Sequence, residues 1–244
     1  MRRSPQGTRC GAQRSTYRGA SPRGAETSPA PNPNTLADTA AARAALEKSL
    51  ALRPLSEPSG RAASLELLAL ALLRAGLIVE AEGRLAEAEK LRREVNSEGV
   101  DAALTQRLRG YVRSAQGRFG DARQELSVAH EVLVGALGRK HPETLRAARA
   151  LGEAELELGQ TEVALARLSE VVEFASPLRV DPLLSVQAKL ALARARRATG
   201  ANQEADRTVR EVRADVARGV SLPPSLLAAI KTWPRMRPVT VVFP

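Results

Sequence analysis

The chain has 244 residues and a formal net charge of +10 at neutral pH, and 43% of its residues are hydrophobic while only 2% are aromatic. A core without aromatic rings can be built from stacked helices that interlock through Ala and Leu. Long stretches of Ala, Leu, Glu and Arg also favour helix over strand. These proportions argue against a ring-rich globular core and predict an all-α protein.

The positive charge is concentrated at the two ends of the chain. Residues 1–34 contain six Arg and one Glu, and residues 231–244 contain three basic residues and no acid, so the ends carry +5 and +3 of the total. Residues 35–230 therefore carry only +2. A nucleic-acid partner is disfavoured, because such partners are bound by strongly basic surfaces that usually include aromatic stacking residues.

The N-terminal segment, residues 1–34, shows no pattern of regular structure. It is rich in Pro, Gly, Ser and Arg and lacks the apolar stretch of a secretion signal, so we expect a disordered basic segment. The single cysteine, Cys10, cannot form an internal disulfide, which fits a reducing compartment. No apolar run approaches the roughly 18 residues of a membrane span. These features predict a cytoplasmic protein without a membrane span.

An internal repeat organises residues 35–219. Four glycines recur at spacings of 41, 42 and 41 residues. An alanine lies five residues after each of these glycines, and an Ala or Gly lies seven residues before it. Such a period predicts a stacked array of similar structural units. The structural repeat positions are Gly76, Ala81, Gly110, Gly117, Ala122, Gly152, Gly159, Ala164, Gly200 and Ala205.

Each copy of the repeat predicts a pair of helices. In the third copy, apolar residues recur at helical spacing over residues 145–158 and again over 161–174. Gly159 lies between them and is expected to end the first helix, because glycine accepts the left-handed backbone conformation of a helix C-terminus. The small residues Gly152 and Ala164 would let the two helices approach closely.

The segment His141-Pro142-Glu143-Thr144 marks a boundary between two copies. Pro142 suits the first turn of a helix, where its missing N–H costs nothing, and Glu143 adds negative charge at the helix N-terminus. Asp181-Pro182 precedes the next copy in the same way without a histidine. We therefore interpret His141 as a helix-start residue and not as a catalytic one.

The repeat resembles the tetratricopeptide repeat (TPR). The residues Leu151-Gly152 and Ala164…Leu168…Val171 match the family pattern, although Glu155 stands where the family has an aromatic residue. The long period and the G-x-x-HP-x-T-L spacer are similar to the kinesin-light-chain variety, over about residues 62–218. The resemblance implies a right-handed α-solenoid of stacked antiparallel helix pairs, a TPR superhelix. Residues 42–50 resemble a second helix whose first helix is missing.

No combination of residues in the sequence indicates an enzyme. His130 and His141 are the only histidines, and neither H-x-x-x-H nor C-x-x-C spacing occurs, so no metal site is expected. A glycine-rich phosphate loop and a G-x-S-x-G nucleophile motif are also missing from the sequence. We expect no catalytic residue and no cofactor.

The family resemblance implies a peptide-binding groove lined by the first helices. We expect this groove to be mildly basic and to take a peptide segment of a partner protein, possibly an acidic one, with a tyrosine as a flat contact. The alternative is that its arginines pair with Glu153, Glu157 and Glu66 and face water. The candidate partner-binding residues are Arg107, Tyr111, Arg146, Arg149, Arg194 and Arg197.

The C-terminal part, residues 220–244, departs from the repeat. Residues 225–233 could form a helix that covers the last apolar face of the array, as the end of a solenoid requires. The Pro-bounded, β-branched residues 239–243 are not helical in pattern, and the sequence gives them no role. We expect a protein-interaction scaffold or adaptor. The alternative is the C-terminal regulatory region of a larger bacterial signalling protein, a Ser/Thr kinase or transcriptional regulator.

Overall fold

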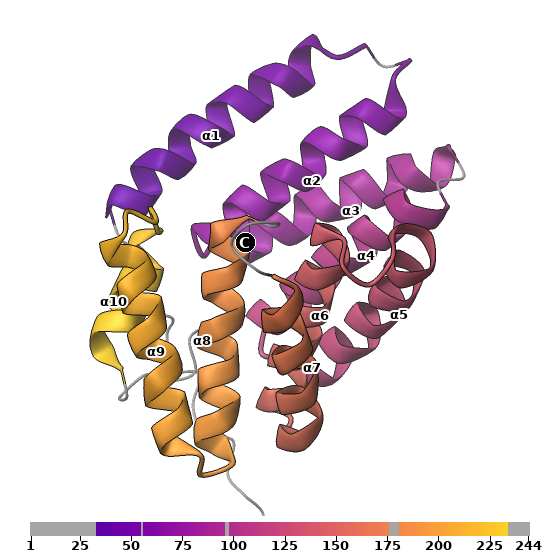
Figure 1. Ribbon diagram of the computed structural model, residues 1–244. Coiled ribbons are helices and arrows are strands. Elements are labelled where there is room, and N and C mark those ends of the chain that lie inside the picture. The colour runs from indigo at the N-terminus through magenta and orange to yellow at the C-terminus, as the bar shows by residue number, and fades with distance from the viewer. Residues whose placement is uncertain (1–32, 55, 96–97, 176–180, 234–244) are drawn as a thin grey trace, which may run out of the picture. The chain divides into compact units, whose positions relative to one another are not determined.

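The computed structural model describes residues 33–54, 56–95, 98–175 and 181–233, and the secondary structure of these ranges is entirely helical (Figure 1). The predicted all-α class is confirmed. The expectations for residues 1–32 and 234–244 lie outside the described residues. The helices are α1 (Pro33–Leu52), α2 (Pro58–Arg74), α3 (Ile78–Glu94), α4 (Gly99–Ala115), α5 (Phe119–Leu137), α6 (Pro142–Glu157), α7 (Thr161–Phe174), α8 (Pro182–Ala198), α9 (Asn202–Ala217) and α10 (Pro224–Thr232).

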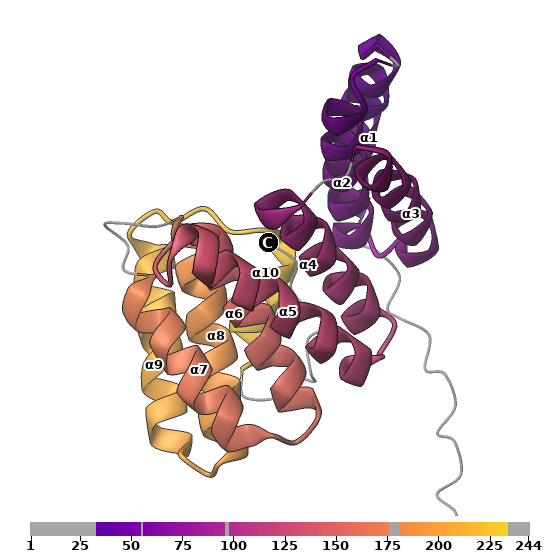
Figure 2. The same cartoon turned by 90° about the vertical axis from the view of Figure 1, so that its right-hand side faces the viewer.

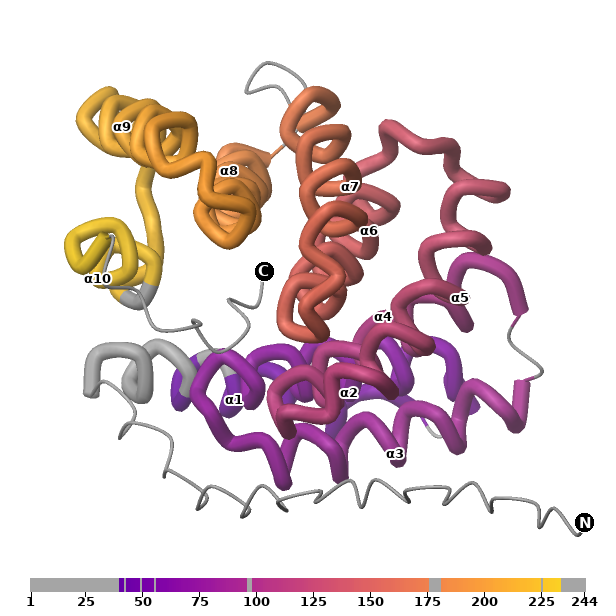
Figure 3. Tube along the Cα trace, turned by 90° about the horizontal axis from the view of Figure 1, so that it is seen from below, coloured from indigo at the N-terminus to yellow at the C-terminus, as the bar shows by residue number. Residues whose placement is uncertain are grey.

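The helices from α2 to α9 form four pairs, and each pair packs on the next in chain order (Figures 2 and 3). Each helix packs most extensively on its neighbours in the chain, as expected for an array of helix pairs. The first helices also contact one another, α2 with α4, α4 with α6 and α6 with α8. This arrangement confirms the predicted α-solenoid, and it brings the first helices of successive units together on one face.

The repeated glycines end the first helices. Gly159 has a φ of 75°, and its N–H donates to the carbonyl of Leu156 at 3.0 Å, while the N–H of Gln160 donates to the carbonyl of Glu155 at 2.9 Å. These two bonds close the helix with a Schellman motif, which satisfies carbonyls at its C-terminus. The same left-handed conformation recurs at the equivalent glycines Gly76, Gly117 and Gly200.

The small residues of the repeat lie where the two helices of a pair are closest. A Cβ atom built on Gly110 would lie 2.5 Å from Cγ of Leu126, and one built on Gly152 would lie 2.8 Å from Cγ of Leu168. The repeated alanines of the second helices are fully buried. The residues that repeat in the sequence therefore lie where the two helices of a pair leave no room for a larger side chain.

The boundary residues begin α6 and α8. His141 is the N-cap of α6, and its Nδ1 accepts a hydrogen bond from the N–H of Glu143 at 3.2 Å. Asp181 caps α8 in the same way, accepting from the N–H of Leu183 at 2.9 Å. A proline follows each cap in the first helical turn. His141 and Asp181 thus share one structural task, the satisfaction of a free N–H at a helix start.

The two ends of the array are covered by single helices. α1 is longer than the residues 42–50 that resemble a second helix, and it packs on α2. At the other end, Leu226 and Ile230 of α10 lie in one apolar cluster with residues of α8 and α9. Trp233 follows α10 and donates from Nε1 to Asp206 of α9 at 2.7 Å. α10 therefore covers the apolar surface that the last helix pair would otherwise expose.

Candidate functional site

A column of buried residues runs along the contacting first helices. The residue three positions before the small residue of each unit is Glu66 on α2, Arg107 on α4, Arg149 on α6 and Leu190 on α8. Each is at least nine-tenths buried, and Arg149 is fully buried. We call these four residues the buried column. Buried charges are costly unless they are paired. The partners of the three charged members therefore decide whether this face has hydrogen-bonding capacity left for a ligand.

Glu66, the first member of the buried column, is fully paired. Arg92 of α3 donates to both of its carboxylate oxygens, each at 3.0 Å, and Thr105 of α4 donates at 2.6 Å. Arg92 also donates to Asp101 at 2.7 Å. The hydrogen bond that Arg92 donates to Glu66 raises the pKa of Arg92, although partial burial opposes this rise. This group ties the first two units together and leaves no evident capacity for a ligand.

Arg107, the second member, is shared between two partners. It donates to Oη of Tyr111 at 3.0 Å and pairs with Glu143 of α6 at 2.7 Å. Burial alone would lower the pKa of Arg107, but the charges of Tyr111 and Glu143 outweigh burial and raise it. Glu143 also pairs with Arg146. Glu143 thus joins α4 to α6, a role that its place at the helix N-terminus does not predict.

Arg149, the third member, has the least complete set of partners. Its Nη1 donates to Oε1 of Glu153 at 2.7 Å, one helical turn away on the same helix. Its Nε and Nη2, together with Oε2 of Glu153, are buried without a hydrogen-bond partner within the described ranges. The Nε of Arg107 is also buried without a hydrogen-bond partner within the described ranges. Buried polar atoms in native proteins are usually paired, so these atoms single out the α4–α6 part of the column.

Tyr111 does not lie at a solvent-facing surface. The structure places it in the core with no exposed area, beside apolar residues of α2, α5 and α6. The guanidinium of Arg107 lies 5.4 Å from the centre of its ring. Arg149 is equally inaccessible. A partner could reach either side chain only after the surrounding residues had moved, because both are covered by the packing of neighbouring helices.

The other candidate arginines are only partly buried or are exposed. Arg146 pairs with Glu143 and, at 3.5 Å, with Asp181, and Arg194 pairs with Glu157 across α6 and α8. Arg197 is exposed and lies 5.9 Å from the centre of the Trp233 ring. The predicted alternative pairings with Glu153 and Glu157 therefore exist, whereas Glu66 pairs with Arg92 and with none of the six candidates.

Arg74, at the end of α2, adds a cation to this face. Partial burial lowers its pKa, the nearby charge of Arg146 lowers it further, and Asp181 opposes both. Arg74 lies on α2, Arg146 lies on α6, and Asp181 directly precedes α8. Three units therefore contribute to one charged surface. We call the solvent-accessible arginines Arg74, Arg146, Arg194 and Arg197 the accessible arginines.

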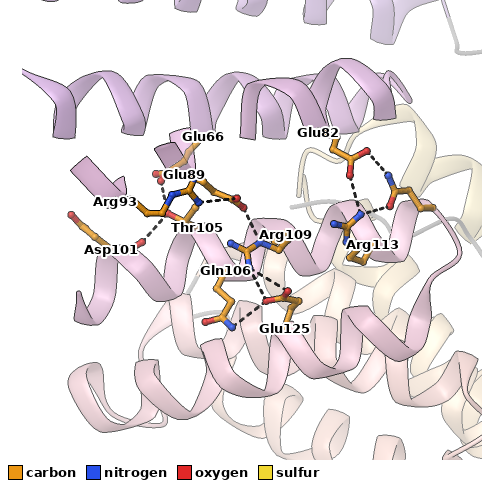
Figure 4. Close-up of polar contacts among 11 residues, drawn as sticks. Glu66, Glu82, Glu89, Arg93, Asp101, Thr105, Gln106, Arg109, Arg113 and Glu125 are labelled. Atoms are coloured by element: carbon orange, nitrogen blue, oxygen red, sulfur yellow. Dashed lines mark hydrogen bonds and ion pairs between the residues drawn. The ribbon is translucent and has the colours of Figure 1, made fainter. Parts of the chain in front are cut away.

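A second polar network lies between α3, α4 and α5 (Figure 4). Arg109 donates to Glu89 at 2.8 Å and to Glu125 at 3.3 Å, and Gln106 donates to Glu125 at 3.1 Å. Figure 4 shows Glu82 meeting Arg113 at the other end of α4, at 2.9 Å. Each of these groups is partly open to solvent. We call this set the α3–α5 network.

The described residues form neither a metal site nor a membrane-spanning helix. Within the described ranges, no group of three or more His, Cys, Asp or Glu side chains could hold a metal ion. No described helix combines the length and the apolar character needed to cross a membrane. Burial lowers the pKa of His130, and the nearby Arg167 lowers it further, but this histidine lies on α5, away from the buried column.

The repeat, the paired helices and the contacting first helices define a tetratricopeptide-type α-solenoid. The tetratricopeptide repeat family model matches residues 101–176. The chain is similar to a putative kinesin light chain of Podosopora anserina with nearly identical TPR-like repeats, with 25% identity over 76% of this chain and 91% of that one and a TM-score of 0.55. The predicted resemblance to kinesin-light-chain-type repeats is confirmed.

Two further structures give the same fold. A single-substitution variant of the Podosopora anserina protein is 26% identical over 75% of this chain and 89% of that one, with a TM-score of 0.56. BtubC (BKLC) from P. vanneervenii is 18% identical over 79% of this chain and 78% of that one, with a TM-score of 0.58, and shows the fold alone. A comparison with curated protein sequences found no match.

Proposed function

We propose that the chain is a non-catalytic protein-interaction module that binds a peptide segment of a partner on the face formed by α2, α4, α6 and α8. The observation that carries this proposal is the direct contact of the first helices, across which ion pairs join successive units: Arg107–Glu143, Arg146–Asp181 and Arg194–Glu157. Extended arrays of this kind present long binding surfaces because each unit adds a helix to the same face.

The chemistry of the partner follows from the accessible arginines. Arg146 and Arg194 are already paired with acids of the chain, whereas Arg197 is exposed and Arg74 lies near both Arg146 and Asp181. Separate acidic side chains of a partner segment would therefore meet Arg74 and Arg197 before the arginines that are already paired. Binding of an acidic segment at these two positions requires no rupture of the buried pairs.

The test is affinity capture with the full-length chain from lysate of the source cells, followed by cross-linking to locate the contact. Arg74→Glu/Arg197→Glu is expected to reduce the captured partner about tenfold, since each reversal replaces an attraction by a repulsion. The matched control is Arg123→Glu/Arg210→Glu, which makes the same charge change at exposed positions of α5 and α9. Equal loss in both variants, or cross-links confined to the second helices, would contradict the proposal.

A further inference from the structure

A pocket of about 280 Å³ is bounded by α7, α8 and α9, where α8 lies between the other two helices (Figures 1 and 3). Its lining includes Val172 of α7, Leu192 and Arg196 of α8 and Thr208 of α9. We call it the α8 pocket. The accessible arginines are not among its lining residues, so it is separate from the surface of the proposed function. Its volume is close to the lower end of the range for ligand pockets, which suits a single side chain.

Arg196 has no acidic partner among the described residues. Its Nη1 donates to Oγ1 of Thr208 at 2.6 Å, and its side chain remains partly exposed. The Thr208 hydroxyl in turn donates to the main-chain carbonyl of Glu204 at 2.9 Å, so the contact brings no negative charge to the guanidinium. The edge formed by Nε and Nη2 is left for an acceptor from outside this part of the chain.

An arginine at the same repeat position has an acid in the second unit. Arg113 and Arg196 each lie four residues before a repeated glycine, and Arg113 pairs with Glu82 of the preceding second helix at 2.9 Å. Leu165 stands on α7 at the position that Glu82 has on α3, and it packs in one apolar cluster with Leu192 of α8. The fourth unit thus keeps the arginine and lacks its acid.

In the third unit an acid occupies this repeat position. Glu155 stands where the fourth unit has Arg196, and both of its carboxylate oxygens accept from Arg167 of α7, each at 2.9 Å. Thr208 stands on α9 at the position of Arg167, eight residues after the repeated glycine. The two positions from which the other units supply an opposite charge therefore hold uncharged residues in the fourth unit, Leu165 and Thr208.

A carboxylate supplies the group that the α8 pocket lacks. Its two oxygens accept parallel hydrogen bonds from one edge of a guanidinium. The apolar side chains of Val172 and Leu192 can cover the methylene groups that carry such a carboxylate. We propose that the α8 pocket binds an aspartate or glutamate side chain of a partner protein, with its carboxylate on Arg196.

The charges around the pocket favour a carboxylate over a phosphate group. Lys189 is already paired with Asp215 at 2.7 Å. The exposed lining residues Arg207, Glu204 and Glu211 add one positive and two negative charges. A phosphate group, which carries about two negative charges, is repelled by the two glutamates more strongly than a carboxylate with one. The partner is therefore an acidic segment and not a phosphorylated one.

The α8 pocket gives a partner a point of attachment apart from the first-helix contacts of the proposed function. An acidic side chain can bind there even where the face formed by α2, α4, α6 and α8 takes no peptide. The two sites can also be inactivated separately, because Arg74→Glu/Arg197→Glu changes no residue of the α8 pocket.

The first experiment titrates the ¹⁵N-labelled full-length chain with the peptide acetyl-Ala-Glu-Ala-amide and follows the arginine Nε–H groups by NMR. The Arg196 signal should shift with a dissociation constant on the order of 1 mM. The uncharged acetyl-Ala-Gln-Ala-amide should bind at least about tenfold more weakly, because it cannot form the charged pair. Equal binding of the two peptides, or tighter binding of inorganic phosphate, would overturn the proposal.

Arginine variants locate the binding in the same titration, followed on the methyl groups of Leu192. Arg196→Met should weaken binding of the glutamate peptide at least about tenfold. Arg113→Met is the matched control, since it removes the equivalent arginine that already has an acid, and it should leave the affinity unchanged. Equal weakening in both variants would contradict binding in the α8 pocket.

The second experiment fills the pocket from within and keeps Arg196 in place. Leu165→Glu supplies an acid at the position of Glu82 and should weaken binding of the glutamate peptide at least about tenfold. Leu165→Gln loses the same apolar surface without adding a charge, and it should change the affinity by less than about twofold. Circular dichroism checks that both variants remain helical. Equal affinity in the two variants would show that Arg196 does not receive the carboxylate.

Discussion

The α3–α5 network and the Arg149–Glu153 pair handle ionic groups in opposite ways. In the network, Arg109 has two acidic partners and some access to water, so no single contact is indispensable. In the buried column, Arg149 has one acidic partner, no access to water, and two nitrogen atoms, Nε and Nη2, without a partner among the described residues. Redundant pairing lets the network lose one contact without leaving a charge unpaired, whereas Arg149 depends on Glu153 alone.

The strongest test of this contrast is to remove the single partner of Arg149. Glu153→Leu leaves a buried guanidinium without an acid and is expected to lower the free energy of unfolding by about 4 kcal/mol. Replacing both residues, as Arg149→Met/Glu153→Leu, removes the charge as well and should return stability to within about 1 kcal/mol of the native chain. Urea titrations followed by circular dichroism measure both values. Equal losses in the single and double variants would mean that the pair is not isolated.

The second test replaces Glu66, a buried member of the column that has more than one hydrogen-bond partner. Glu66→Leu should lower the free energy of unfolding by about 2 kcal/mol, less than Glu153→Leu, because Arg92 keeps Asp101 at 2.7 Å. The same urea titrations give the comparison. Glu66→Leu/Asp101→Asn removes the second acid and should restore the larger loss. If the single variant already costs as much as Glu153→Leu, the contact with Asp101 gives Arg92 no protection.

Substitution in the Glu82–Arg113 pair of the α3–α5 network should hardly change the free energy of unfolding. Arg113→Met breaks a pair with Glu82 that is partly exposed on both sides, and exposed ion pairs contribute about 0.5 kcal/mol or less. The expected change in the urea midpoint is therefore close to the error of the measurement. Raising the salt concentration should remove what remains of the difference, since salt screens exposed charges. A loss above 1 kcal/mol would place this pair with the buried ones.

The helices were predictable because the sequence repeats the constraints that define them. Gly159 and Gly152 recur in kind wherever a helix must end or two helices must approach, so spacing alone locates the units. The sequence also identified His141 as a helix-start residue, because Asp181 stands at the same boundary without a histidine. Local chemistry and the period were sufficient for these conclusions.

The partners of the arginines could not be predicted in the same way. Arg107 and Arg149 occupy equivalent positions, yet one bridges to Glu143 of the next unit and the other pairs within its own helix. The choice depends on the position of α6 relative to α4, which is set by packing far along the chain. Tyr111 was expected at a surface for the same reason: its helical position identifies a face, but not how closely the neighbouring helices cover it.

His130 gives the smallest expected effect and extends the contrast to pH. Burial lowers its pKa, as does the charge of Arg167, while Glu170 acts in the opposite direction. Between this lowered value and the ordinary His pKa of about 6.5, the unfolded chain binds more protons than the folded one, so stability rises with pH. The contribution is thus complete above about pH 6.5 and is lost as the pH falls below that value.

Thermal unfolding of the native chain and His130→Gln at pH 7.5 and 5.5 isolates this contribution, because every other titrating group is common to both. We expect the fall in Tm between the two pH values to be smaller in the variant by about 1 °C. His141→Gln serves as the control, since His141 lies at the solvent-accessible start of α6 and its change should act mainly on the helix cap. Identical pH dependence in the native chain and His130→Gln would contradict this prediction. It would mean that water or a rearranged Glu170 stabilises the protonated His130 in the folded chain. The position of His130 on α5 would then tolerate a charge as well as the α3–α5 network does.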